Sequence, residues 1–97
     1  MADAKIVLVT GANTGIGWEL VKALLQSSQP YRIFLGSRSI EKGEAAIKAL
    51  QNDVPNTNST VELVQIDIES DDSINDAFEK VNAGPGYIDV LVNNAGL

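Results

Sequence analysis

An apolar run, three closely spaced glycines and then a helical pattern form the feature that most constrains the fold. Ile6–Val9 is a run of four aliphatic residues, which is typical of a strand buried on both faces of a parallel sheet. Gly11, Gly15 and Gly17 follow, and from Ile16 apolar residues recur at positions 16, 20, 21, 24 and 25, which predicts a helix. A strand that passes through a glycine turn directly into a helix is a local structure that binds anions. We therefore expect an anion site at the start of this helix.

Strand and helix patterns alternate along all 97 residues. Further strands are predicted at 33–35, 61–66 and 88–92, and helices are predicted after the capping residues Ser39 and Ser70. Phe78 is expected on the core face of the last helix. The order βαβαβαβ with short connections predicts a parallel sheet that carries helices on its faces. The expected fold class is α/β, the first βαβαβαβ portion of a Rossmann-type doubly wound parallel sheet with strand order 3-2-1-4.

Composition excludes several kinds of chemistry and several partners. The chain has no cysteine and no histidine, which rules out disulfides and thiolate catalysis and removes the commonest metal ligand and general base. The formal net charge is −6, and residues 53–97 carry nine Asp or Glu against one Lys or Arg, so no nucleic acid is expected as a partner. The apolar runs are too short for a membrane span, and residues 1–10 lack a signal-peptide pattern. We therefore expect a cytoplasmic protein without membrane contact.

Three motifs at matching separations indicate a family. Thr10-Gly-Ala-Asn-Thr-Gly-Ile-Gly17 reads TGxxxGxG rather than the literal GxGxxG of the dinucleotide fingerprint. Asp67 follows the third predicted strand, and Asn93-Asn-Ala-Gly96 ends the fourth. With these motifs the chain resembles the N-terminal part of a short-chain dehydrogenase/reductase, and residues 33–50 are similar to carbonyl-reductase-like members. Residues 1–97 are then expected to be the N-terminal cofactor-binding part of a single Rossmann-type domain, with the remainder absent.

The resemblance implies a role in cofactor binding for each motif. Gly11 allows the turn, Gly15 lets backbone N–H groups approach a pyrophosphate, and Gly17 lets the helix pack against the sheet. Asp67 would contact the adenine ring, although a turn before the next helix would also explain it. Small residues at 94–96 would leave room for a ribose, although a plain strand-ending turn would look the same, and Asn93 is expected to tie strands together. The expected cofactor-binding residues are Gly11, Asn13, Thr14, Gly15, Ile16, Gly17, Ser37, Arg38, Asp67, Ile68, Asn94, Ala95 and Gly96.

The end of the second strand predicts which cofactor binds. Enzymes that use NAD carry a carboxylate about 20 residues past the glycine loop, where it binds the ribose 2′-hydroxyl. Residues 36–38 are Gly-Ser-Arg and hold no carboxylate. Arg38 offers a planar donor fork suited to a 2′-phosphate, Ser37 adds a hydroxyl, and Lys42 lies one helical turn further on. We therefore predict NADP(H) as the cofactor and a small carbonyl compound as the substrate of the complete protein.

The family's catalytic Tyr-x-x-x-Lys element is missing from this chain. Four positions after Tyr31 and Tyr87 stand Leu35 and Leu91, so no catalytic residue is expected, and residues 1–97 alone are expected to be inactive. The resemblance implies hydride transfer between NADPH and a carbonyl or alcohol. An alternative is a non-catalytic NADP(H)-binding sensor or scaffold, and an extended sugar-nucleotide epimerase fits less well because such relatives read TGxxGxxG. The fourth strand would form an apolar sheet edge through which copies could self-associate.

Overall fold

Strands and helices alternate in the computed structural model in the order that the sequence predicts. The structure describes residues 4–12, 15–67 and 69–93. Within them the elements are β1 (Lys5–Thr10), α1 (Gly15–Gln26), β2 (Tyr31–Ser37), α2 (Ile40–Asp53), β3 (Thr60–Gln65), α3 (Asp71–Ala83) and β4 (Val90–Asn93).

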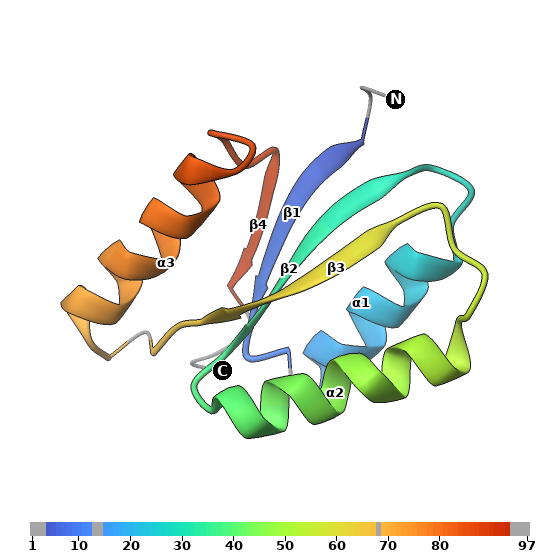
Figure 1. Cartoon of the computed structure of the whole chain (residues 1–97), viewed down its shortest axis with the longest axis horizontal. Coiled ribbons are helices and arrows are strands. Elements are labelled where there is room, and N and C mark those ends of the chain that lie inside the picture. Colours follow the sequence, from blue (N-terminus) through green and yellow to red (C-terminus); the bar gives the residue numbers. More distant parts are fainter. Residues whose placement is uncertain (1–3, 13–14, 68, 94–97) are drawn as a thin grey trace.

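The four described strands form one parallel sheet with the order β3-β2-β1-β4. Val7 of β1 lies opposite Ile33 of β2 on one side and Val90 of β4 on the other. Because all strands run in the same direction, their carboxyl ends meet at one edge of the sheet (Figure 1). The predicted fold class and strand order are confirmed.

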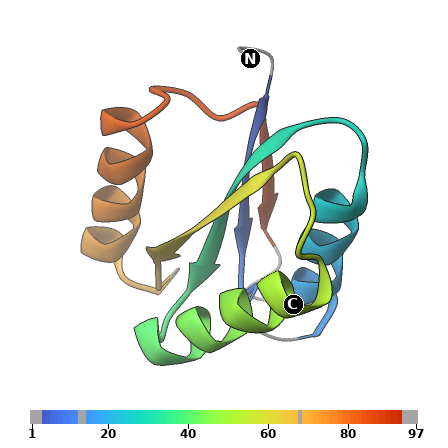
Figure 2. The same ribbon diagram turned by 45° about the vertical axis from the view of Figure 1, so that its right-hand side comes forward.

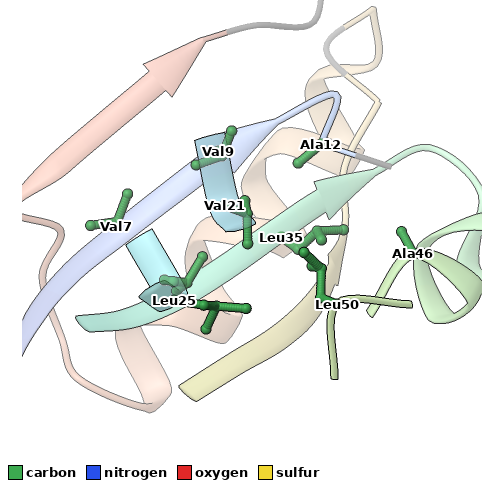
Figure 3. Packing of buried hydrophobic residues seen from close by; sticks show 9 residues of the cluster. Val7, Val9, Ala12, Val21, Leu25, Leu35, Ala46 and Leu50 are labelled. Carbon is green, nitrogen blue, oxygen red and sulfur yellow. The ribbon is translucent and has the colours of Figure 1, made fainter. Parts of the chain in front are cut away.

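Helices cover both faces of the sheet, and each face has its own core. α1 and α2 lie on one face and α3 lies on the other (Figure 2). Side chains alternate along each strand, so Val7 and Val9 point to α1 and α2, whereas Ile6 and Leu8 point to α3. In the first core, side chains of both helices meet the sheet (Figure 3); its buried members are Val7, Val9, Ala12, Val21, Leu25, Ile33, Leu35, Ala46 and Leu50. Each larger side chain buried here contributes about 1.5–3 kcal/mol, which makes this core a main source of stability.

Two serines begin the second and third helices, as their sequence positions predict. The Ser39 hydroxyl accepts a hydrogen bond from the Lys42 N–H at 3.2 Å, and the Ser70 hydroxyl accepts one from the Ser73 N–H at 3.3 Å. Such a cap contributes about 1 kcal/mol. Through the first of these caps, the start of α2 is held next to the end of β2.

Some boundaries and two apolar side chains differ from the sequence prediction. β2 extends beyond 33–35 at both ends, and β4 begins at Val90 rather than at position 88. Ile16 is 77% exposed and Phe78 is 40% exposed, although the apolar spacing assigned both to core faces. The buried residues of α1 are Gly17, Val21 and Leu25, four positions apart, so the buried stripe turns away from Ile16. α3 likewise meets the sheet through Ala77 and Val81, which leaves Phe78 at the side of the helix.

None of the helices in the described part of the chain is long and apolar enough to cross a membrane.

Candidate nucleotide-binding site

The turn between β1 and α1 contains glycines whose backbone conformation most residues avoid. Gly11 has a φ of 62° and Gly15 a φ of 65°, both in the left-handed region. A Cβ on Gly15 would meet nothing within 4 Å, so its conformation rather than its surroundings demands glycine. Between them, the N–H of Ala12 donates to the carbonyl of Gly36 at 2.9 Å, which fastens the turn to β2. The predicted site residues Asn13 and Thr14 lie outside the described residues.

The amino end of α1 is electrostatically open to an anion. Its first turn carries no acidic residue, whereas the first turn of α2 carries Glu41 and that of α3 carries Asp71 and Asp72. The amino end of a helix bears a partial positive charge and unpaired N–H groups. Gly17 in this first turn is buried, as expected for a helix that packs closely on the sheet. The start of α1 can therefore hold a phosphate group, as the glycine pattern predicts.

Gly36 lets the carboxyl ends of the strands approach one another. A Cβ at this position would lie 2.8 Å from Cγ2 of Ile66, 3.0 Å from the carbonyl oxygen of Val9 and 3.2 Å from Cα of Thr10. Two of these three atoms belong to the backbone of β1 and cannot rotate away. The lack of a side chain at Gly36 is thus what allows β1 and the chain after β3 to meet at the end of β2.

The segment after Gly36 is hydrogen-bonded to the end of β3 and within itself. The Ser37 carbonyl accepts from the N–H of Ile66 at 3.0 Å, and the Arg38 carbonyl accepts from the side-chain amide of Gln65 at 3.2 Å. The Ser37 side chain is buried, and its hydroxyl is bonded to the backbone of Ser39. The side chain of Arg38, in contrast, is exposed.

Arg38 and Lys42 form no ion pair with an acidic residue within the described part of the chain. The ion pairs found there are Lys22 with Asp53 and Arg32 with Glu62. Arg38 lies just before the amino end of α2, whose dipole is unfavourable for a cation. Two unpaired cations at this place therefore favour binding of an anion from outside the chain.

Asp67 lies in a hydrogen-bonded turn after β3. Its N–H donates to the Ser73 hydroxyl at 2.8 Å, and its carboxylate oxygen Oδ1 accepts from the N–H of Glu69 at 3.0 Å. Its carbonyl accepts from the N–H of Ser70 at 2.9 Å. These hydrogen bonds place Asp67 in the turn before α3, and the same turn holds the carboxylate at the edge of the sheet where the strands end. Ile68, its predicted companion, lies outside the described residues.

A pocket of about 580 Å³ lies at the carboxyl ends of the first three strands. Its lining residues are Gly11, Ser37, Arg38, Ser39, Lys42, Ile66 and Asp67. Four of them were predicted as cofactor residues, and they come from three separate strand ends. Ser39 and Ile66 were not predicted as site residues. Their positions could have indicated them, because Ser39 is the helix cap next to Arg38 and Ile66 is the last apolar residue before Asp67. The remaining predicted residues 94–96 lie outside the described part.

The tyrosines lie away from this pocket. Tyr31 begins β2 and Ser37 ends it, so at about 3.3 Å per residue the two are roughly 20 Å apart. Tyr87 precedes β4, at the end of that strand opposite to the pocket, and its side chain is 55% exposed. Neither tyrosine is placed to act on a ligand in the pocket.

Comparison with known proteins agrees with this arrangement. A family model described as short chain dehydrogenase matches residues 5–97. The short-chain dehydrogenase/reductase tropE of Talaromyces stipitatus is 47% identical over 97 residues, which are 100% of this chain and 36% of that protein. The menthone neomenthol reductase structure from Mentha piperita has a TM-score of 0.88 at 33% identity, and the similarity covers 99% of this chain and 33% of that one.

A third similar protein has been solved with a cofactor. The NADPH-bound carbonyl reductase from chicken fatty liver has a TM-score of 0.78 at 29% identity, over 100% of this chain and 36% of that one. The chain thus spans about a third of the length of each of these three proteins. Because the family model matches nearly the whole chain and the strand order and glycine turn agree with it, this chain belongs to the short-chain dehydrogenase family.

Proposed function

We propose that this chain binds NADP(H) at the carboxyl ends of its strands, with the 2′-phosphate of the adenosine beside Arg38 and Lys42. The observation that carries the proposal is that these two cations line one pocket and have no acidic partner among the described residues. A phosphate has the charge and the acceptor oxygens that a guanidinium and an ammonium group bind. The pocket volume of about 580 Å³ also falls within the range of roughly 300–1,000 Å³ usual for small-molecule sites.

The other parts of the cofactor have candidate positions in the same surface. The pyrophosphate would lie at the amino end of α1, where Gly11 and Gly15 turn the backbone and no carboxylate stands in the first turn. The adenine would lie between the end of β2 and Asp67. The NADPH found with the similar carbonyl reductase supports this assignment, as does the absence of Asp or Glu at positions 36–38.

The proposed activity is that of an NADP(H)-dependent oxidoreductase acting on a carbonyl or alcohol substrate. NADPH would supply the hydride to a carbonyl and NADP+ would accept it from an alcohol, and the residues of this chain would bind and orient the cofactor. Because Tyr31 and Tyr87 lie at the amino ends of their strands, opposite the edge that would hold the cofactor, we expect residues 1–97 alone to give no turnover. NADPH oxidation followed by absorbance with a simple aldehyde checks this, and a rate above the blank that is lost on mutation of Tyr31 or Tyr87 would contradict it.

Arg38→Ala is the variant that tests the cofactor assignment. Loss of hydrogen bonds to a charged group costs about 1.5–3 kcal/mol, so the dissociation constant for NADPH should rise about 10- to 150-fold while that for NADH stays unchanged. Isothermal titration with both cofactors measures this. Arg32→Ala is the matched control, because Arg32 lies near the start of β2, the strand that Arg38 follows, and bonds Glu62 away from the pocket. Equal weakening of both cofactors by Arg38→Ala, or none of either, would contradict the assignment.

Two further parts of the proposal concern self-association and cellular location. β4 is at an edge of the described sheet, and Val90 and Leu91 are 44% and 52% exposed. We expect residues 1–97 to associate with a second copy through this edge, and sedimentation velocity that shows only monomer at high concentration would refute it. The cytoplasmic location stays a prediction from the sequence, which cell fractionation checks.

A further inference from the structure

We propose that Ser37 is a positioning residue that fixes the turn presenting Arg38, rather than a ligand of the cofactor phosphate. This inference rests on the proposed function, because it concerns the same pocket. The hydroxyl of Ser37 donates to the carbonyl of Ser39 at 2.9 Å and accepts from the N–H of Ser39 at 3.2 Å. A serine hydroxyl has one hydrogen and two acceptor sites. Its only hydrogen is therefore directed to Ser39. The acceptor site that remains cannot donate a hydrogen bond to an anionic phosphate.

The surroundings of Ser37 support this role. Its side chain is only 1% exposed, so the hydroxyl is enclosed beneath the first turn of α2. A Cβ on Gly43 would lie 3.2 Å from Cβ of Ser37 and would also collide with Leu63, which shows how closely α2 covers the end of β2. The hydroxyl is thus buried and hydrogen-bonded within the protein, whereas the side chain of Arg38 next to it is exposed.

The hydrogen bonds of Ser37 continue into the start of α2. Ser39, which both bonds of Ser37 reach, caps the helix by accepting from the N–H of Lys42 through its own hydroxyl. Its carbonyl accepts from the N–H of Gly43 at 2.9 Å. On the other side, Gln65 bonds the carbonyl of Arg38. The backbone of Arg38 is therefore fixed by Ser37 and Gln65 together, while its guanidinium stays available to the pocket.

A double-mutant cycle distinguishes a positioning residue from a ligand. If Ser37 acts through Arg38, Ser37→Ala should weaken NADPH binding about fivefold to tenfold and leave NADH binding unchanged. In an Arg38→Ala background the same substitution should then have no further effect on NADPH. An independent ligand would instead add its full effect in both backgrounds.

Amide hydrogen exchange gives a second readout that needs no cofactor. The N–H groups of Ser39 and Lys42 are bonded to the hydroxyls of Ser37 and Ser39, respectively. Both should exchange faster in Ser37→Ala, because the turn loosens. Ser59→Ala is the matched control, since Ser59 is a buried serine that bonds the N–H of Tyr31 at the opposite end of β2. It should lower stability without changing the ratio of NADPH to NADH affinity.

The outcomes separate the two proposals. If Arg38→Ala leaves NADPH binding unchanged, the proposed cofactor preference is wrong and the role of Ser37 fails with it. If Arg38→Ala weakens NADPH binding and Ser37→Ala adds its full effect in that background, the preference stands and only the positioning role is overturned. Unchanged exchange at Ser39 and Lys42 in Ser37→Ala would also overturn the positioning role. Loss of the Ser37→Ala effect in the Arg38→Ala background, together with faster exchange at Ser39 and Lys42, supports it.

Discussion

Gly36→Ala should destabilise the protein, because the added Cβ would collide with three atoms at the point where the strand ends meet. The added Cβ would lie 2.8 Å from Ile66, 3.0 Å from the Val9 carbonyl oxygen and 3.2 Å from Cα of Thr10. Gly36 does not have a positive φ, so alanine can adopt its backbone conformation. Replacing glycine at a compatible position normally stabilises by about 0.4–1 kcal/mol, which here works against the collisions.

The expected net effect follows from these two opposing contributions. Overpacking of a dense interior costs about 1–3 kcal/mol, and two of the three contacted atoms belong to the backbone of β1. We therefore expect a net loss of about 1–2 kcal/mol after subtraction of the gain from the unfolded state. Ile66→Ala removes the side chain that causes the shortest contact but leaves both contacts with β1. In the Ile66→Ala background, Gly36→Ala should therefore still destabilise, though by less.

Urea unfolding of the wild type, both single variants and the double variant measures these free energies. NADPH titration of Gly36→Ala should show weaker binding as well, because the end of β1 and the pocket residue Ile66 must move apart. A Gly36→Ala protein as stable as the wild type would refute the close approach of the strand ends. Complete rescue by Ile66→Ala would refute the part assigned to the backbone of β1.

Two further substitutions test contacts outside the pocket. The carboxylate of Asp89 accepts from the N–H of Ile6 at 2.8 Å, so Asp89→Ala should lower the free energy of unfolding by about 1–3 kcal/mol. Asp89→Asn keeps an acceptor and should lose less; equal losses in the two variants would contradict this role. Trp18 donates from Nε1 to the carbonyl of Ala46 at 3.1 Å, so Trp18→Phe should cost about 0.5–1.5 kcal/mol. Urea unfolding followed by circular dichroism measures both, and an unchanged midpoint for Trp18→Phe would show that this link between α1 and α2 contributes nothing.

Local sequence signals were sufficient for the order of the elements and for the caps. The run Ile6–Val9 and the switch to helical spacing after it depend only on neighbouring residues, and so do the capping positions of Ser39 and Ser70. Right-handed connections limit the possible strand orders, and 3-2-1-4 is the order of a doubly wound sheet, in which the chain returns to the other side of the first strand. The family motifs assigned the strand ends to one site, and the structure brings Gly11, Ser37, Arg38 and Asp67 to one pocket.

Other features depend on contacts between residues far apart in the chain. The crowding at Gly36 arises from β1 and Ile66, and that at Gly43 arises from Leu63 of β3, so spacing alone did not indicate either. The exposure of Ile16 and Phe78 depends on how each helix is rotated about its axis on the sheet. The apolar spacing defines the buried face of a helix only to within about one residue. The bonding of the Ser37 hydroxyl was not predictable from its residue type, because a serine there suits a ligand or a turn equally well. Asn13, Thr14, Ile68, Asn94, Ala95 and Gly96 stay predictions from the family motifs.

The ratio of NADH to NADPH dissociation constants for the wild-type protein tests the central claim most directly. Titrations at low and high salt would be compared, because attraction between Arg38, Lys42 and a 2′-phosphate is partly screened by ions. The account predicts that NADPH binds at least about tenfold more tightly at low salt, as expected for charge-assisted hydrogen bonds, and that the ratio falls as salt rises. Equal affinity for the two cofactors, or tighter binding of NADH, would contradict it.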